Sequence, residues 1–298
     1  MKIPASVVHT ALRLVARPMF GPPVPVGVQR RFNELLFTAA PLPKRTVVEQ
    51  VVLGGRPGER VSVPGSDVSR TDGQHADGRT VLLLHGGAFL TGSSRTHRVL
   101  AAHLAAAAGV PVHVLDYRRA PEHPWPAAED DAVAAYDALA AAGPVAVVGD
   151  SAGGTLALLL ARQRTPVALA LISPLVDLTR ETSRTWTGGD ALIRQGWLKQ
   201  GGEAFVGTAD AHALSPLFDD LSGLPPLLVH VSGVECLRPE GELLVERARA
   251  AGVDAELVLL PDLWHDVHLV AHLVAEAADA SAALGRWVGA RLAGAKPG

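Results

Sequence analysis

A regular alternation of short apolar segments and helical segments, between residues 81 and 172, is the feature that most constrains the fold. The apolar segments are rich in valine and leucine and cover residues 81–84, 110–115, 145–148 and 167–172. Continuous apolar runs of this length are typical of strands that are buried on both faces of a parallel sheet. Helical patterns lie between them, at residues 95–108, 127–142 and 152–164. This β-α-β order predicts a parallel sheet with helices on both faces and right-handed connections.

Segments before and after this alternation extend the expected sheet. Residues 46–53 and 59–63 are valine-rich and are separated by Gly-Gly-Arg-Pro-Gly, which is typical of a hairpin. Residues 65–79 are rich in Gly, Asp and Ser and are expected to form a loop. Later strands are expected at 227–231 and 256–260, and later helices at 239–251 and 267–293. The predicted fold class is therefore α/β, with a mostly parallel eight-stranded sheet flanked by helices.

Two segments do not fit the alternation. Residues 1–45 combine a helical pattern with a proline-rich section and show no strand pattern. Residues 179–214 contain two tryptophans and several glycines, again without a strand pattern. We therefore expect one α/β domain, formed by residues 46–178 and 215–298, with an N-terminal addition and an insertion after its sixth strand.

The N-terminal segment is apolar enough to raise the question of a targeting signal. His9 and Arg13 interrupt the run, whereas a secretory signal has an unbroken apolar stretch of about 7–15 residues. Val8, Leu12 and Val15 recur at helical spacing. An amphipathic helix is therefore expected here.

The composition excludes several classes of protein. Hydrophobic residues make up 48% of the chain and charged residues 19%, which fits a large buried core rather than a disordered chain. The net charge is −3 and no basic stripe is present, so nucleic acid is not an expected partner. No stretch approaches the roughly 18 apolar residues that span a membrane. The single cysteine, Cys236, excludes an intramolecular disulfide and a cysteine-based metal cluster, and it agrees with a reducing, cytoplasmic location.

The strongest local signal is Gly-Asp-Ser-Ala-Gly-Gly at residues 149–154, between an expected strand and an expected helix. A chain that turns sharply from strand into helix strains the backbone at Ser151 and presents its hydroxyl at the end of the sheet. Gly149 and Gly153 flank the turn, where a Cβ atom would collide with neighbouring backbone. A Gly-Ser loop without a function is the alternative, but the strand–turn–helix context favours Ser151 as a nucleophile.

A second glycine-rich segment, His-Gly-Gly-Ala at residues 85–88, directly follows the third expected strand. Attack on a carbonyl group places negative charge on its oxygen, and amide donors prepared for that charge are worth ~2.7–4 kcal/mol each. The amide after the nucleophile, that of Ala152, is one expected donor. Gly87 and Ala88 are the first choices in the loop, with Gly86 as a further candidate.

The order of residues along the chain indicates the base and the acid that would activate Ser151. A serine on such a turn is followed first by its acid and then by its histidine. His265 lies in the loop after the last expected strand, where its imidazole could reach the turn at Ser151. Glu235 follows the preceding strand and is the candidate acid, which would fix the imidazole tautomer. Asp262 and Asp266 flank His265 and are its rivals, although neighbouring side chains usually point in different directions.

The remaining histidines have other expected roles. His268 and His272 have the i, i+4 spacing of a metal-binding pair, but no H-E-x-x-H pattern accompanies them. A surface or interface position is therefore expected for both, and no metal site. His230 alternates within a strand and is expected to be packed, whereas His85 is expected to brace its loop by hydrogen bonding.

Together these segments resemble the hormone-sensitive-lipase-like family of bacterial esterases, which have the α/β-hydrolase fold. The motifs are the two named above and Asp-Tyr-Arg-Arg-Ala-Pro-Glu-His-Pro-Trp-Pro (116–126), Ser-Pro-Leu-Val-Asp-Leu-Thr (173–179) and Glu-Cys-Leu-Arg (235–238). The resemblance extends over about residues 45–290. It implies hydrolysis of small-to-medium carboxylic esters without a cofactor. It also implies a triad formed by Ser151, Glu235 and His265. The implied oxyanion donors are Gly86, Gly87 and Ala152.

The chain departs from the family pattern at three positions: Ala88 replaces a glycine, Glu235 an aspartate and Cys236 a proline. The methyl group of Ala88 is expected to narrow the acyl or alcohol site. The resemblance also implies that residues 1–45 and 179–214 form a helical cap over the site. Homodimerisation through the last strand and the final helix stays open.

Two other functions are compatible with the same features. An amidase, a lactonase or a deacetylase of a specialised metabolite uses the same groups as an esterase, so only competing substrates separate them. A non-catalytic receptor for small molecules on the same fold typically loses the base. The presence of His265 favours an enzyme.

Overall fold

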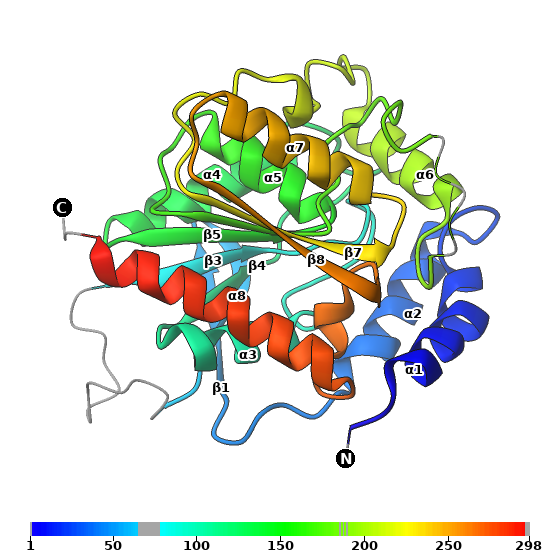
Figure 1. Ribbon diagram of the computed structural model, residues 1–298, viewed down its shortest axis with the longest axis horizontal. Helices are drawn as coiled ribbons and strands as arrows, with labels where there is room; N and C mark the ends of the chain where they lie inside the picture. Colours follow the sequence, from blue (N-terminus) through cyan, green and yellow to red (C-terminus); the bar gives the residue numbers. More distant parts are fainter. Residues whose placement is uncertain (1, 65–77, 185, 187, 189, 296–298) are drawn as a thin grey trace.

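The sheet is mixed at one edge and parallel elsewhere. The computed structural model describes residues 2–64, 78–184, 186, 188 and 190–295, and in this part of the chain the sheet has eight strands in the order β1-β2-β4-β3-β5-β6-β7-β8 (Figure 1). The strands are β1 (Val47–Leu53), β2 (Arg56–Ser62), β3 (Thr80–Leu84), β4 (Val112–Leu115), β5 (Val145–Asp150), β6 (Leu169–Ile172), β7 (Leu227–Val234) and β8 (Ala255–Trp264). Strand β2 is antiparallel to β1 and β4, and the remaining pairs are parallel. The expected eight-stranded α/β fold is confirmed.

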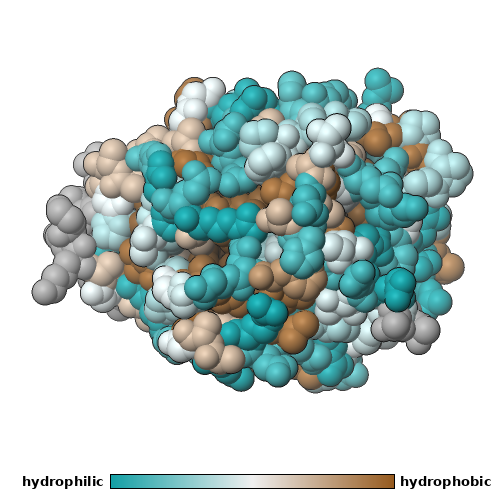
Figure 2. Space-filling view, turned by 90° about the horizontal axis from the view of Figure 1, so that it is seen from above, coloured by the Kyte–Doolittle hydropathy of each residue, from teal (hydrophilic) through white to brown (hydrophobic). Residues whose placement is uncertain are grey.

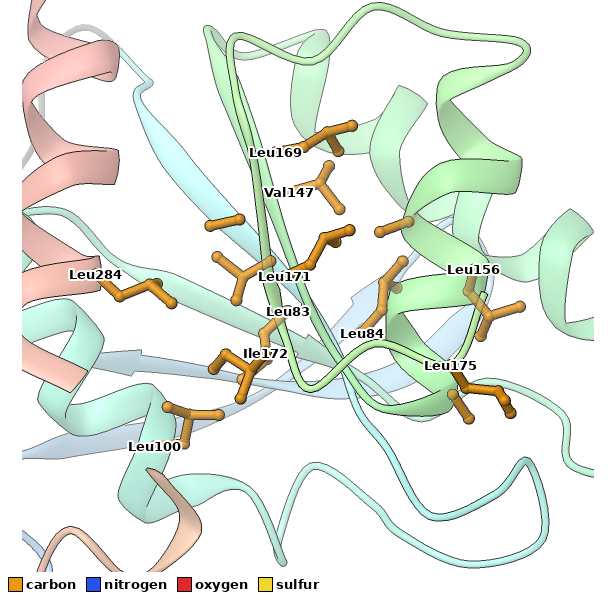
Figure 3. Close-up of a cluster of buried hydrophobic side chains, with 14 of the residues drawn as sticks. Leu83, Leu84, Leu100, Val147, Leu156, Leu169, Leu171, Ile172, Leu175 and Leu284 are labelled. Atoms are coloured by element: carbon orange, nitrogen blue, oxygen red, sulfur yellow. The ribbon is translucent and has the colours of Figure 1, made fainter. Parts of the chain in front are cut away.

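Helices cover both faces of the sheet. One face carries α3 (Arg98–Ala108) and α8 (Ala275–Gly294), and the other carries α4 (Ala127–Ala140), α5 (Ala152–Ala161) and α7 (Arg238–Ala250). Figure 3 shows Leu100 and Leu284 on one side of the central strands and Leu156 on the other. All residues of β3, β5 and β6 are buried, because each strand is covered from both sides.

The last helix is interrupted. Residues 267–293 were expected to form one helix, but Val267–Val270 form a 3₁₀ turn and α8 begins only at Ala275. Val274 between them is extended, with φ −107° and ψ 131°. No glycine or proline marks this break, so the apolar pattern alone did not reveal it. The loop expected at 65–79 lies, apart from its last two residues, outside the described residues.

The N-terminal segment forms more helix than its sequence pattern predicts. Helix α1 (Ala5–Ala11) continues as a π-helix over Leu12–Ala16. The wider π-helical turn changes the register of the apolar face, so Val8 and Leu12 are buried but Val15 is 62% exposed. A further helix, α2 (Val26–Thr38), follows Pro25. Pro25 is the N-cap residue of this helix, where a missing N–H costs no helical hydrogen bond.

Helices of the N-terminal segment and of the insertion gather beyond the ends of β7 and β8 (Figure 1). Helix α6 (Gln195–Val206) belongs to the insertion. The rings of Phe20 and Trp197 stack at 4.5 Å, which joins the two segments. The rings of Phe89 and Phe205 stack at 4.0 Å, which joins α6 to the loop after β3. We refer to the helices that these contacts join as the cap.

The outer surface in the view of Figure 2 is mostly hydrophilic, with small and separate hydrophobic patches. Among the described helices, none has both the length and the apolar character that crossing a membrane requires.

Glu240 in α7 connects this helix to the loop after β6. Its Oε2 accepts hydrogen bonds from the amides of Val176 (2.8 Å) and Asp177 (2.9 Å), and the residue is fully buried. Burial raises the pKa of this carboxyl to about 7. The same loop supports the nucleophile turn, because Leu175 N–H donates to the carbonyl of Ser151 at 3.0 Å.

We expect Glu240→Ala to lower the free energy of unfolding by at least about 2 kcal/mol. The substitution leaves two buried amides without acceptors, at roughly 1–3 kcal/mol each. Chemical denaturation measures the loss, with Glu246→Ala as the control because Glu246 is exposed on the same helix. Equal stability of the two variants would show that these hydrogen bonds do not hold the loop.

Candidate active site

Ser151 lies on a strained turn between β5 and α5. Its backbone has φ 52° and ψ −117°, a left-handed region that non-glycine residues rarely adopt. Two glycines make the turn possible. A Cβ on Gly149 would lie 2.3 Å from the carbonyl oxygen of Gly153, and one on Gly153 would lie 1.9 Å from that of Leu84. The turn carries the serine at the carboxyl end of the sheet, as its motif predicts.

The loop after β3 presents free amides beside this turn. Gly87 has φ 113° and Ala88 has φ 52°, and neither amide has a hydrogen-bond acceptor in the described part of the chain. The amide of Ala152 belongs to the first turn of α5, where helical N–H groups have no partner within the helix. Gly86 differs, because its N–H already donates to Asp150 Oδ2 at 3.0 Å.

The methyl group of Ala88 does not narrow the site, contrary to the expectation from the sequence. Ala88 does not line the cavity next to Ser151. A Cβ built on Gly201 of α6 would lie 2.8 Å from the Ala88 methyl. The methyl therefore faces the cap helix, and Gly201 provides the room for it.

The imidazole of His265 is bound to Glu235, as the order along the chain predicts. Its Nδ1 lies 2.9 Å from Glu235 Oε2, and the other carboxylate oxygen accepts the amide of Ser232 at 2.6 Å. Both residues are buried. Burial lowers the pKa of His265, but the charges and hydrogen bonds of Asp266 and Glu235 outweigh it and hold the pKa well above its usual 6.5.

The two rival aspartates differ from each other. Asp262 is exposed and makes no contact with the imidazole among the described residues. Asp266 is buried, and its Oδ2 lies 3.0 Å from His265 Nε2. A neighbouring side chain thus reaches the ring, but at the nitrogen opposite Glu235. The hydroxyl of Ser151 has no hydrogen-bond partner in the described part of the chain and lines the same cavity as His265.

His97 is a residue of the site that sequence reasoning missed. It precedes α3, and its Nε2 lies 3.1 Å from Asp150 Oδ2. Burial lowers the pKa of His97, but the charge and hydrogen bond of Asp150 raise it above the usual value. Asp150 thus binds both His97 and the amide of Gly86, and it ties α3, the loop after β3 and the nucleophile turn together. Nothing in the spacing of His97 signals this contact.

Three other histidines make hydrogen-bonding or packing contacts within the fold. His85 Nδ1 lies 2.8 Å from the carbonyl of Gly86, and its ring stacks on Tyr117, which fits the expected bracing role. His230 is packed as expected. His268 is 1% exposed and lies 3.1 Å from His230, so the expectation of a surface position is wrong for it. The 3₁₀ turn before α8 directs its side chain inward.

A small cavity of about 30 Å³ lies next to the nucleophile. Ser151, His265, Gly86 and Gly87 form its polar floor, and side chains of the cap form its roof: Phe20, Asn33, Phe37, Leu192 and Trp197. This small volume favours a short group beside Ser151 over a long one.

Comparisons with known proteins agree with this geometry. A family model described as alpha/beta hydrolase fold matches residues 81–269. The chain is 35% identical to the putative acetyl-hydrolase LipR of Mycobacterium tuberculosis, over 99% of this chain and 96% of the relative. It is 38% identical to an acetyl-hydrolase of Streptomyces hygroscopicus, over 72% of this chain and 77% of the relative.

Solved structures give the same result. An esterase from the bacterial hormone-sensitive lipase (HSL) family matches with a TM-score of 0.84 and 34% identity, over 97% of this chain and 98% of that chain. A hormone-sensitive lipase from a metagenome library matches with a TM-score of 0.85 and 34% identity, over 98% and 100%. The chain therefore belongs to the alpha/beta hydrolase fold family, among its bacterial hormone-sensitive-lipase-like esterases, and is a serine hydrolase.

Proposed function

We propose that the protein hydrolyses small carboxylic esters through an acyl-enzyme, with Ser151 as nucleophile, His265 as base and Glu235 as acid. The observation that carries the proposal is the cavity shared by Ser151 and His265, with the imidazole bound to buried Glu235 on its far side. The amides of Gly87, Ala88 and Ala152 are the proposed oxyanion donors. Gly86 is better explained as a residue that positions the loop, because Asp150 occupies its N–H.

The proposed mechanism has two steps with the same groups. His265 Nε2 takes the proton of Ser151 as its oxygen attacks the ester carbon, and the free amides bind the oxygen that becomes negative. The alcohol leaves with the proton from His265. Water then attacks the acyl-enzyme by the same route and releases the acid. Glu235 holds the hydrogen on Nδ1, so that Nε2 is the nitrogen that exchanges protons.

Acetyl is the acyl group that we propose for this site. The small volume of the cavity, about 30 Å³, favours a short acyl chain over an extended one. Two relatives, from M. tuberculosis and S. hygroscopicus, are named acetyl-hydrolases. Their names support acetyl removal from esters, and they leave acetyl amides as the second candidate. Competition between acetyl esters, acetyl amides and lactones for the purified protein separates these substrates.

A series of p-nitrophenyl esters tests the acyl preference. We expect kcat/KM to fall by about tenfold or more between acetate and hexanoate, because each methylene group that does not fit an apolar pocket costs roughly 1–3 kcal/mol. Leu192→Ala enlarges the cavity and should raise the hexanoate-to-acetate ratio. Leu35→Ala is the control, because Leu35 is 73% exposed on α2. A wild-type enzyme that prefers hexanoate would contradict the proposed acyl site.

Other expectations from the sequence stay predictions. These are the division into a cap (1–45 and 179–214) and a catalytic domain (46–178 and 215–298), the homodimer and the cytoplasmic location.

A further inference from the structure

Both ring nitrogens of His265 face carboxylates. Nδ1 lies 2.9 Å from Glu235 Oε2, and Nε2 lies 3.0 Å from Asp266 Oδ2. His265 and Asp266 are only 2% and 6% exposed, so solvent screens their interaction little. The proposed reaction uses only the contact with Glu235, because Nε2 has to accept the proton of Ser151. The triad therefore does not account for Asp266.

The contact between His265 Nε2 and Asp266 Oδ2 requires a hydrogen between the two atoms. An imidazole nitrogen without hydrogen and a carboxylate oxygen are both acceptors, and two acceptors 3.0 Å apart repel each other. A hydrogen therefore lies between them, on Nε2 or on the carboxyl group. Since Glu235 already binds the hydrogen on Nδ1, His265 and its two carboxyl groups hold one proton more than in the state that can accept from Ser151.

The backbone of Asp266 directs its carboxyl group into the cavity. The residue has φ 52° and ψ 36°, a left-handed conformation that is uncommon outside glycine and that Asp and Asn adopt most readily. Its N–H donates to Ser173 Oγ at 3.4 Å. Asp266 lines the cavity next to Ser151, and its Oδ1 is buried without a hydrogen-bond partner in the described part of the chain. The carboxyl group is thus held beside the nucleophile.

We propose that Asp266 is a positioning residue that holds His265 in a resting state, with a hydrogen shared between Nε2 and its carboxyl group. In this state the imidazole cannot take the proton of Ser151. Passage to the reactive state releases one proton to solvent and breaks the contact. His265 then keeps the hydrogen on Nδ1 and turns the Nε2 lone pair to Ser151. The inference rests on the proposed function and adds a condition on the pH at which that function operates.

The surrounding charges favour the resting state. Four titratable groups from different elements act on His265 or Asp266. They are Glu235 in the loop after β7, Asp190 in the insertion, Asp150 at the end of β5 and His97 at the start of α3. Three of them are carboxyl groups, so the negative field stabilises the additional proton. The raised pKa of His265 agrees with this arrangement. The pH dependence of kcat/KM reports the pKa values of the free enzyme. The acid limb of this profile, where kcat/KM falls as the pH is lowered, should therefore lie well above pH 6.5 in the wild type.

The variant Asp266→Asn tests the inference. Asparagine has the same shape and accepts the left-handed backbone, but its amide can donate to the Nε2 lone pair, so no additional proton is needed. Loss of an adjacent charge shifts a pKa by about one unit or more. We expect the acid limb of kcat/KM to move to lower pH by this amount. At a pH one unit below the wild-type limb, the kcat/KM of Asp266→Asn, taken as a fraction of its plateau, should exceed the corresponding wild-type fraction by up to about tenfold.

Asp262→Asn is the matched control, because Asp262 is an exposed carboxylate near the end of β8, close to Asp266 in the sequence. Its limb should coincide with that of the wild type. A merely structural role of Asp266 would lower the plateau of Asp266→Asn without moving its limb, and an unmoved limb overturns the inference. An equal shift in both variants also overturns it, because the shift would then follow net charge.

An NMR titration of the His265 ring needs no substrate and separates this inference from the proposed function. The titration is compared between wild type and Asp266→Asn. A lower midpoint in the variant supports the contact between the two residues even if turnover proves independent of Ser151, in which case the proposed function fails. Identical midpoints overturn the inference whatever the activity.

Discussion

Ser151→Ala should reduce kcat for p-nitrophenyl acetate by about a million-fold, the order of loss expected when a triad nucleophile is removed. The variant keeps the cavity and the free amides of Gly87 and Ala88, but no oxygen remains to form the acyl-enzyme. A small residual rate over water is expected, because the oxyanion donors and binding still act. A spectrophotometric assay of nitrophenolate release measures the effect.

The control for this variant is Ser281→Ala. Ser281 is a buried serine of α8, and its hydroxyl donates to the carbonyl of Ala277 within the same helix. Its removal should leave kcat within about twofold of the wild type, since it does not line the cavity. Thermal unfolding of both variants shows that each is folded. Turnover by Ser151→Ala at the wild-type rate would remove the proposed mechanism.

Glu235→Gln should reduce kcat by about 10⁴-fold, the size of effect seen when an amide replaces a triad carboxylate and selects the wrong tautomer. The glutamine oxygen is expected to keep the hydrogen bond from the Ser232 amide, because that amide can only donate. The glutamine NH₂ group then points to His265 Nδ1. A donor there forces the hydrogen of the imidazole onto Nε2, which leaves no lone pair for the proton of Ser151.

Asp262→Asn gives the comparison for the acid. Asp262 lies closer to His265 in sequence than Glu235 does but is exposed, so its kcat should be unchanged. The reverse pattern, a large loss in Asp262→Asn and none in Glu235→Gln, would assign the acid to Asp262 near the end of β8. Circular dichroism of both variants excludes unfolding as the cause of a loss.

The parts of the site that the sequence could predict are those that need a special backbone. The turn at Ser151 needs glycines where a Cβ atom would lie about 2 Å from backbone, and such a requirement is visible as a motif. Buried parallel strands likewise need apolar side chains on both faces, and these produce the alternation that identified the sheet. Both signals are local, so a single sequence contains them.

Contacts between distant segments have no such signal. His97 meets Asp150 only because α3 begins beside the nucleophile turn, and its neighbours in the sequence do not reveal this. The contact of Asp266 with Nε2 depends on a left-handed residue, which reverses the usual expectation that neighbouring side chains diverge. The π-helical turn exposes Val15 although its spacing is helical. Each miss arises from backbone or tertiary geometry that local periodicity does not encode.

The adduct formed with a p-nitrophenyl phosphonate tests the central claim most directly, since it does not depend on which ester the protein hydrolyses. The reagent traps a serine that is activated by a base next to oxyanion donors. Peptide mass spectrometry should find one adduct per chain, on Ser151, and the rate of labelling should fall strongly in His265→Ala. An active protein that is labelled at another residue, or is not labelled at all, would contradict Ser151 as the nucleophile.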